Sequence, residues 1–201
     1  MLMPPRGVWA IASDLESATE AMQWADGAAC AQAFSFRSTQ PQSARISLAC
    51  LQSMRERLPW LAVHARASWA RLVGADALIV GSRGLPVFET QQLWDSSLGL
   101  SSHSPDDLQI AQSGGFAFAF ASPIWATPSK AGILEPLGLE TLRNQVADFD
   151  VPLIALGGVS TPAQVAQCAE AGAHGVAVLR AAQEPKLLAE MVDAWRETAK
   201  A

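Results

Sequence analysis

Short apolar runs alternate with helix-like segments along the whole chain, and this alternation restricts the fold more than any other feature. The runs have the length of β-strands and are apolar throughout, which is typical of strands buried on both faces of a parallel sheet. We expect strands over Val8–Ala12, Ala28–Phe36, Trp60–His64, Ala77–Gly81, Leu98–Ser101, Phe116–Ala121, Pro152–Leu156 and Gly175–Leu179.

The segments that follow these runs have the spacing or the composition of α-helices. Ser104-Pro105-Asp106-Asp107 places a cap, a first-turn proline and two acidic residues in the usual order, and Ser160-Thr161-Pro162 is similar. We expect helices over Asp14–Trp24, Ser43–Arg57, Arg66–Val73, Pro86–Trp94, Pro105–Gln112, Gly138–Ala147, Thr161–Ala171 and Pro185–Thr198.

Three similar strings lead from a helix into the next strand: Val73–Val80, Ser113–Phe118 and Ala171–Val178. Each contains a glycine that can adopt the left-handed conformation at a helix end. Eight strand–helix units in 201 residues predict an α/β fold, a single (β/α)8 TIM barrel over residues 1–201. An open doubly wound sheet is the alternative, but eight units would be many for this length. We also expect Trp60, Trp69 and Trp94 to pack between strands and outer helices.

The charge of the chain restricts its partners. The formal net charge is −5 and the isoelectric point is about 5.1, which argues against general nucleic-acid binding. A local basic pocket for a small anion remains compatible with this charge.

Three observations favour a cytoplasmic protein without a membrane partner. Residues 1–14 contain prolines where a secretory signal needs its apolar stretch, and no run approaches the roughly 20 apolar residues of a membrane span. Cys30, Cys50 and Cys168 are odd in number and widely spaced, so they match neither a disulfide framework nor a metal motif. We expect them to be buried or half-buried thiols.

Active sites of (β/α)8 barrels lie at the carboxyl ends of the strands, so residues directly after each strand are the candidates. Gly157 and Gly158 follow the seventh run, where backbone N–H groups of this fold often bind phosphate; a tight turn is the alternative explanation. Thr127, Ser129 and Lys130 follow the sixth run and could face one anion together, unless they belong to a polar surface loop.

Five strings occur in a fixed order between Leu98 and Arg180: Gly99–Ser104, Thr127–Gly132, Pro136–Leu139, Ala155–Val159 and Ala171–Val178. Together they resemble the thiamine-phosphate synthase and thiazole tautomerase family. Val63–Pro86 is similar more loosely, and the first 60 residues mainly by architecture. The family is a single (β/α)8 barrel, in agreement with the pattern of strands and helices.

The resemblance implies a phosphate site. Synthases of this family join a pyrimidine diphosphate to a thiazole phosphate and release diphosphate. Their thiazole phosphate lies on the positions that are Gly157, Gly158, Leu179 and Arg180 here. Arg180 stands where the family usually has serine, so it either adds charge to the site or obstructs it.

The resemblance also implies further contacts with the substrate. Thr127, Ser129 and Lys130 match a Thr-x-Thr-Lys motif, and Ser101 matches a polar position after the fifth strand. The second strand keeps one certain cation, Arg37, of a Gln-x-Arg-x-Lys motif. In the loop after the sixth strand, Trp125 is a candidate to stack on a flat heteroaromatic ring.

The residues that hold Mg²⁺ in the synthases are replaced. An Asn-Asp pair after the third strand becomes His64-Ala65, and an aspartate after the fourth strand becomes Gly84. Mg²⁺ prefers carboxylate oxygens, so the chain has no obvious ligands for it. We expect no metal and no cofactor, with Mg²⁺ needed only if synthase activity is retained.

The tautomerase branch lacks these carboxylates too, and it makes an aromatic thiazole by a metal-free proton shift. Its catalytic histidine lies in the loop after the sixth strand, where this chain has Pro123. His64 and His103 are the candidates to replace it, beside Lys130. His103 is usual throughout the family, which favours a structural role for it. His174 precedes the eighth strand and is excluded.

These implications favour a thiamine-biosynthesis barrel that binds a thiazole phosphate and is closer to the tautomerase than to the synthase. A synthase with rearranged ligands and a non-catalytic binding protein are the alternatives. The partner is a small phosphate ligand, and the family's frequent dimers allow a homodimer. Gly158→Asp should abolish phosphate binding and leave the fold largely intact.

Overall fold

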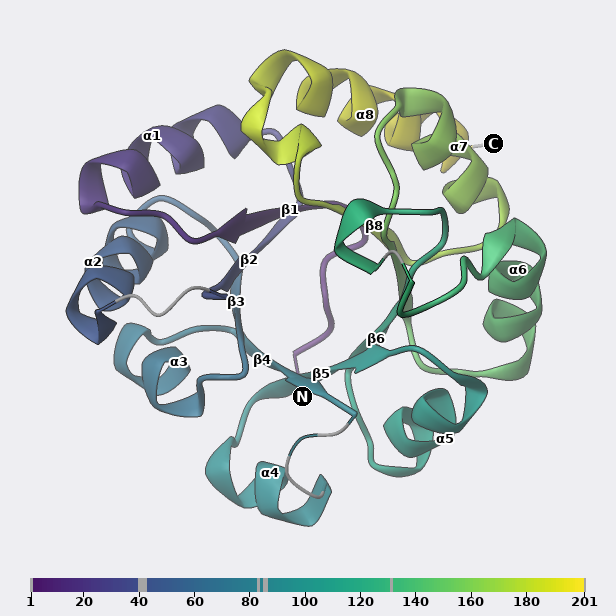
Figure 1. Cartoon of the computed structure of the whole chain (residues 1–201), viewed down its shortest axis with the longest axis horizontal. Coiled ribbons are helices and arrows are strands. Elements are labelled where there is room, and N and C mark those ends of the chain that lie inside the picture. Colours follow the sequence, from purple (N-terminus) through teal and green to yellow (C-terminus); the bar gives the residue numbers. More distant parts are fainter. Residues whose placement is uncertain (1, 40–42, 83, 85–86, 131, 201) are drawn as a thin grey trace.

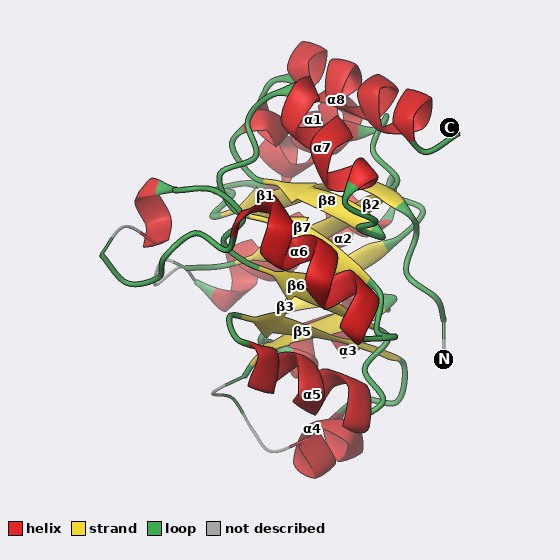
Figure 2. Cartoon of the chain, turned by 90° about the vertical axis from the view of Figure 1, so that its right-hand side faces the viewer, coloured by secondary structure: helices red, strands yellow, loops and turns green. Residues whose placement is uncertain are grey.

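Eight parallel strands form a closed barrel with eight helices around it in the part of the chain that the structure describes (Figures 1 and 2). The structure is a computed structural model and describes residues 2–39, 43–82, 84, 87–130 and 132–200. Each strand pairs with the next in chain order, and β1 pairs with β8. The predicted (β/α)8 barrel is therefore confirmed.

The strands are short and almost entirely buried, as the apolar runs predicted. They are β1 (Gly7–Ser13), β2 (Ala33–Arg37), β3 (Leu61–His64), β4 (Ala77–Gly81), β5 (Ser97–Ser102), β6 (Phe118–Ala121), β7 (Leu153–Leu156) and β8 (Gly175–Val178).

A helix follows each strand, and two short 3-10 helices lie in the loops after β6 and β8. The helices are α1 (Ala18–Ala28), α2 (Ala44–Arg55), α3 (Ala67–Val73), α4 (Val87–Leu93), α5 (Pro105–Ser113), η1 (Pro128–Lys130), α6 (Gly138–Asp148), α7 (Pro162–Glu170), η2 (Ala181–Gln183) and α8 (Pro185–Thr198). Pro86, the expected first residue of α4, and Ala131 of the loop motif lie outside the described residues.

The first helix and the second strand begin later than expected. Ser17 accepts a hydrogen bond from the N–H of Glu20 at 3.2 Å, so α1 begins after this cap rather than at Asp14. Asp14 itself has a positive φ of 56°, which no helix contains. At its other end, α1 continues to Ala28, the residue at which we expected the strand to begin.

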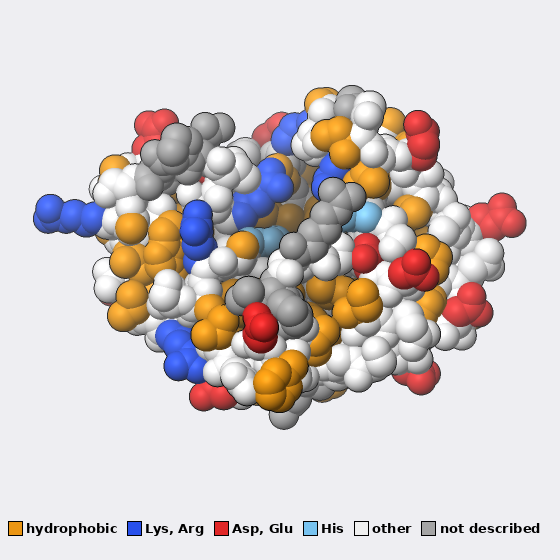
Figure 3. All heavy atoms as spheres, turned by 60° about the horizontal axis from the view of Figure 1, so that its bottom comes forward, with side chains coloured by type: hydrophobic (Ala, Val, Ile, Leu, Met, Phe, Trp, Pro, Cys, Tyr) orange, Lys and Arg blue, Asp and Glu red, His pale blue; other side chains and the backbone are white. Residues whose placement is uncertain are grey.

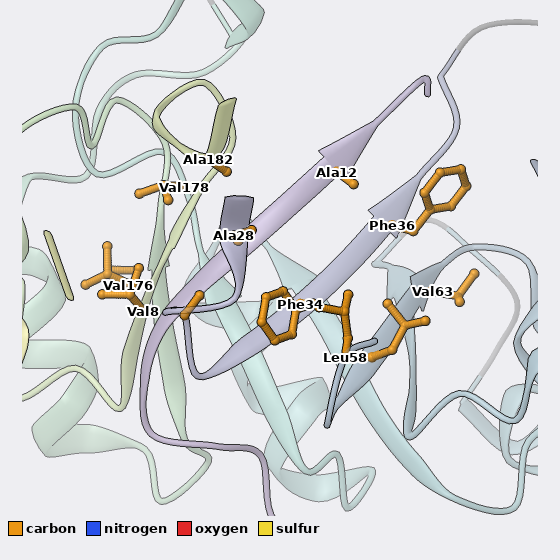
Figure 4. Packing of buried hydrophobic residues seen from close by; sticks show 14 of the residues in the cluster. Val8, Ala12, Ala28, Phe34, Phe36, Leu58, Val63, Val176, Val178 and Ala182 are labelled. Atoms are coloured by element: carbon orange, nitrogen blue, oxygen red, sulfur yellow. The ribbon is translucent and has the colours of Figure 1, made fainter. Parts of the chain in front are cut away.

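Along most of the strands, side chains alternate between two apolar clusters. Outward-facing residues such as Val8, Phe34 and Val63 pack against the surrounding helices (Figure 4). Inward-facing residues such as Trp9 and Phe118 fill the barrel interior. The alternation follows from the two-residue period of a strand.

Large aromatic rings fill the barrel interior, and small residues make room for them. The ring of Trp9 lies 4.7 Å from that of Trp60 and 5.0 Å from that of Phe118, centroid to centroid. A Cβ at Gly99 would lie 2.3 Å from the Phe118 ring, so the glycine makes room for it. The prediction that Trp60 packs against outer helices is wrong, because Trp60 is in phase with the inward-facing Ala62. Trp69 and Trp94 do belong to the outer cluster.

The N-terminal segment crosses the amino ends of the strands, inside the ring in Figure 1. Ser97 Oγ donates to the carbonyl of Leu2, and Trp9 Nε1 donates to that of Pro5. The opposite end of the barrel is where the candidate site lies. Along the described ranges, we find no helix with the length and apolarity to cross a membrane.

Candidate active site

A cavity of about 430 Å³ lies at the carboxyl ends of the strands, a volume typical of small-molecule sites. It brings together every predicted site residue except Trp125, although these residues come from six of the strands and their loops. Those that line it are Arg37, His64, Ser101, His103, Thr127, Ser129, Lys130, Gly157, Gly158, Leu179 and Arg180.

The charged side chains that line the cavity are basic. Arg37, Lys130 and Arg180 contribute cations, and the described lining residues include no aspartate or glutamate. Figure 3 shows Lys, Arg and His side chains gathered around a hollow on this face. A basic cavity in a chain of net charge −5 is suited to an anionic ligand.

Backbone N–H groups at one end of this cavity are unused. Gly157, Gly158 and Val159 follow β7, and within the described residues their N–H groups donate to no protein acceptor. Leu179 and Arg180 follow β8 on the same side, directly before η2. Loops after the seventh and eighth strands and a short extra helix form the usual phosphate site of this fold.

The two glycines are also required by packing. Trp125 N–H donates to the carbonyl of Gly157 at 3.0 Å, so the loop after β6 lies directly on the loop after β7. With φ of +74°, a Cβ at Gly158 would lie 2.6 Å from the Cβ of Trp125. Trp125 therefore lies behind Gly158 and is not among the cavity-lining residues. For the same reason, we expect Gly158→Asp to destabilise the fold as well as to disturb the phosphate site.

His103 follows β5 and has both ring nitrogens in defined contacts. Its Nδ1 lies 2.8 Å from the carbonyl oxygen of Ser122, and its Nε2 lies 3.5 Å from Nζ of Lys130. Its backbone N–H donates to the carboxylate of Asp107 at 2.7 Å, in the first turn of α5. The histidine thus links three segments around the cavity.

The hydroxyls of the loop after β6 lie beside this pair. Thr127 Oγ1 is 3.4 Å from Ser129 Oγ, and both residues line the cavity with Lys130. Thr127 is buried and Ser129 is exposed. Close hydroxyl and ammonium groups can donate several hydrogen bonds to one anion.

Arg37 is held in place from the β1 side of the cavity. Its Nε donates to Ser13 Oγ at 3.2 Å, and that hydroxyl donates to the Asp14 carboxylate at 2.7 Å. The same carboxylate accepts the N–H of Thr39 at 2.6 Å. These contacts orient the Arg37 guanidinium. They start at Ser13, at the end of β1, which is two strands away from β7 and its glycines.

His64 forms part of the cavity wall as a neutral ring. Its Nε2 lies 3.2 Å from Ser35 Oγ, and its ring stacks on Phe120 with 6.1 Å between centroids. Burial first, and the charge of Arg37 second, lower the pKa of His64 from 6.5 to about 3. The imidazolium form is thus strongly disfavoured here.

The residues present do not fit a Mg²⁺ site. His64, Ala65 and Gly84 stand where synthases of the family have amide and carboxylate ligands. No group of three His, Cys, Asp or Glu side chains among the described residues is placed to hold a metal ion. Because Mg²⁺ is bound through oxygen ligands, usually carboxylates, we derive no chemical step through it.

Sequence reasoning missed several residues of this site: Ile11, Ser13, Ser35 and Phe120. Ser35 had a detectable signal, since it is the polar residue in the apolar stretch Ala33-Phe34-Ser35-Phe36. Phe120 had none, because its strand consists of alternating Phe and Ala. Which of the two faces points inward depends on the register of the barrel.

A closed (β/α)8 barrel with a basic cavity at the carboxyl ends of its strands defines the class of this protein. Within that class, the chain belongs to the thiamine monophosphate synthase family, whose sequence profile matches residues 11–182.

Individual relatives agree with this assignment. The chain is 36% identical over 137 residues to the thiamine-phosphate synthase of Mycobacterium bovis strain BCG, covering 65% of this chain and 61% of that protein. It is 35% identical over 124 residues to the thiamine-phosphate synthase of a Synechocystis species, covering 61% and 36% respectively. The matched region thus spans less than two thirds of these relatives.

The fold has a close counterpart among solved structures. Thiamine phosphate pyrophosphorylase from Pyrococcus furiosus superposes with a TM-score of 0.79 and 23% identity, over 96% of both chains. At this identity the likeness supports the fold alone.

Proposed function

We propose that this chain is a metal-independent member of the family that binds a thiazole phosphate and catalyses a proton shift on its ring. The carrying observation is the cavity itself, which combines three cations and two histidines with no carboxylate among its described lining residues. Such a lining favours an anionic ligand and offers acid/base groups, but it offers no carboxylate for a divalent cation.

The phosphate end is proposed at the loops after β7 and β8. Within the described part of the chain, the N–H groups of Gly157, Gly158 and Leu179 donate to no protein acceptor, so they suit phosphate oxygens, and Arg180 adds a cation beside them. The heterocycle would then extend toward His103 and Lys130, which line the same cavity. Of the two roles considered for Arg180, we favour the added charge, because its side chain is exposed at the rim.

A second candidate function is thiamine-phosphate synthase, and the names of the curated relatives favour it. In that reaction a diphosphate leaves, and its developing charge must be neutralised. Arg37 and Lys130 would have to replace the metal ion. The third candidate is a binding protein without catalysis.

One set of assays separates the three candidates. The purified chain is mixed with the non-aromatic thiazole phosphate tautomer in deuterated buffer with EDTA, and ring-proton exchange is followed by NMR. A parallel reaction contains pyrimidine diphosphate, thiazole phosphate and Mg²⁺, and product formation is followed.

We expect exchange in the first assay that does not change when Mg²⁺ replaces EDTA. Rapid formation of thiamine phosphate in the second assay would instead establish a synthase. Calorimetric binding of thiazole phosphate without either reaction would establish a binding protein, and absence of binding would contradict all three functions.

A further inference from the structure

Resting on the proposed function, we infer that His103 is the acid/base of this cavity and that the carbonyl of Ser122 determines which of its nitrogens accepts the proton. This assignment follows from the contacts of the His103 ring with Ser122 and Lys130, which differ from the contact that the His64 ring makes. The sequence alone favoured a structural role for His103.

Hydrogen bonds to the start of α5 hold the backbone of His103 in place. Its N–H donates to Asp107 Oδ2 at 2.7 Å, while the N–H of Asp107 is capped by Ser104 Oγ at 3.2 Å. The N-terminal turn of α5 thus holds the residue that precedes it. Because the backbone is held, only the side-chain torsions of His103 set the direction of its imidazole.

The contact with Ser122 defines the tautomer. A carbonyl oxygen can only accept, so Nδ1, 2.8 Å away, must carry the hydrogen. In a neutral imidazole the other nitrogen, Nε2, then has its lone pair free to accept. This is the arrangement that a general base requires, with the base oriented by a second group.

Lys130 supports the same tautomer from the other side. A lysine ammonium can only donate, and its Nζ lies 3.5 Å from Nε2 of His103. Since Lys130 also lines the cavity, an anionic ligand attracts its ammonium and competes for that donor. Binding of the ligand would therefore release Nε2 beside the ring that is to react.

The proton shift is balanced without any other reactant. Nε2 forms an N–H bond with a proton taken from one ring position of the ligand, and the electron pair of the broken bond moves into the conjugated ring. The imidazolium then returns a proton to a second ring position. Its positive charge is stabilised meanwhile by the Nδ1–H bond to Ser122, and the ammonium of Lys130 stabilises the ligand's negative charge.

His64 is poorly suited to this step. Its Nε2 contacts the Ser35 hydroxyl, and its ring stacks on Phe120. The charge of Arg37 further disfavours the protonated form of His64. A base at this position would have to form a second cation beside a guanidinium. We assign it to the wall that shapes the ligand site.

The test uses His103→Asn, because an asparagine amide N–H occupies nearly the position of Nδ1–H and can keep the bond to Ser122. Nε2 is removed, so we expect ring-proton exchange to fall at least 100-fold. The melting temperature should stay close to that of the unchanged chain, and the affinity for inorganic phosphate should stay within about twofold of it. The matched control is His174→Gln at the opposite end of the barrel, whose amide can keep the contact of His174 Nε2 with the Pro4 carbonyl.

The outcomes separate this inference from the proposed function. Exchange in the unchanged chain and in His174→Gln, lost in His103→Asn and partly restored by free imidazole, supports both. Equal exchange in His103→Asn overturns the role of His103 alone. No exchange in the unchanged chain, despite phosphate binding, overturns the proposed function and the inference with it. Long-range ¹H–¹⁵N NMR gives an independent readout, and a hydrogen found on Nε2 in place of Nδ1 overturns the tautomer assignment.

Discussion

Gly157 and Gly158 serve two needs at once. Their positive φ angles of 96° and 74° turn the chain sharply after β7, and their missing side chains let the loop after β6 approach. The same absence of side chains leaves the N–H groups open to the cavity. Packing and ligand access are thus satisfied by the same two residues, so a substitution cannot test one without the other.

The cost of filling this position can be measured with Gly158→Ala. We expect the free energy of unfolding in urea to fall by about 2–4 kcal/mol, from a strained φ and from the collision with Trp125. Gly74→Ala is the control, since Gly74 has a φ of +62° with nothing within 4 Å of the added Cβ. It should lose only about 1 kcal/mol. Equal losses at the two sites would mean that the loop after β6 yields freely.

His64 should make the stability of the protein depend on pH. Its pKa is about 3 in the folded chain against 6.5 for an unperturbed histidine, so the unfolded chain takes up a proton first as the pH falls below about 6.5. The free energy of unfolding therefore decreases below that pH, by up to about 1.4 kcal/mol per pH unit, until the folded form is protonated as well.

The comparison with His64→Asn isolates this effect. Between pH 7 and pH 5 the unchanged chain should lose up to roughly 2 kcal/mol of stability relative to the variant, as measured by urea unfolding. A stability difference that is the same at both pH values would show that His64 titrates normally in the folded protein.

At the scale of the elements, the helix that follows the glycine loop is fixed at its first turn. Thr161 accepts the N–H of Gln164 at 3.3 Å, and the Gln164 side chain accepts the N–H of Thr161 at 3.2 Å. The N-cap of this reciprocal capping box, Thr161, lies three residues after Gly158, and α7 begins at the next residue. It therefore sets where the loop ends.

Removal of this cap should weaken the element measurably. Thr161→Ala is expected to lower the free energy of unfolding by about 1 kcal/mol, because the N–H of Gln164 loses its hydroxyl partner. Thr161→Ser keeps the hydroxyl and should stay within about 0.3 kcal/mol of the unchanged chain. If serine and alanine destabilise α7 equally, the methyl group rather than the cap is responsible.

At the scale of the whole molecule, the closed barrel controls access to the thiols. Cys50 and Cys168 have no exposed surface, while Cys30 is half-buried. Burial raises the pKa of all three thiols, that of Cys168 to about 12. This confirms the predicted buried or half-buried thiols.

A thiol reagent should therefore distinguish local from global opening. With DTNB at pH 8 we expect Cys30 to react first, and Cys50 and Cys168 to react at the rate of global unfolding. Rapid reaction of all three thiols in the folded protein would contradict a barrel that opens only as a unit.

Much of this architecture was predictable from local patterns. The apolar runs predicted eight strands, and the cap before Pro105 and the glycine after Val73 marked helix ends that the structure confirms. The order of elements also places the residues after each strand at one end of the barrel, which is why the cavity unites nearly all predicted site residues. The predictions for Ala28 and Trp60 were wrong because apolarity alone does not decide between helix and strand at Ala28. Nor does it decide between the outer and the inner side of the barrel at Trp60.

The sequence by itself determined the class of fold, the family and the basic, carboxylate-poor character of the site, because these depend on residue types and their order. Only the tertiary structure decided that Trp125 supports Gly158 from behind and that His103, between Ser122 and Lys130, is better placed than His64 to exchange a proton. Those distinctions depend on contacts between loops far apart in the chain, and such contacts exist only once the barrel closes.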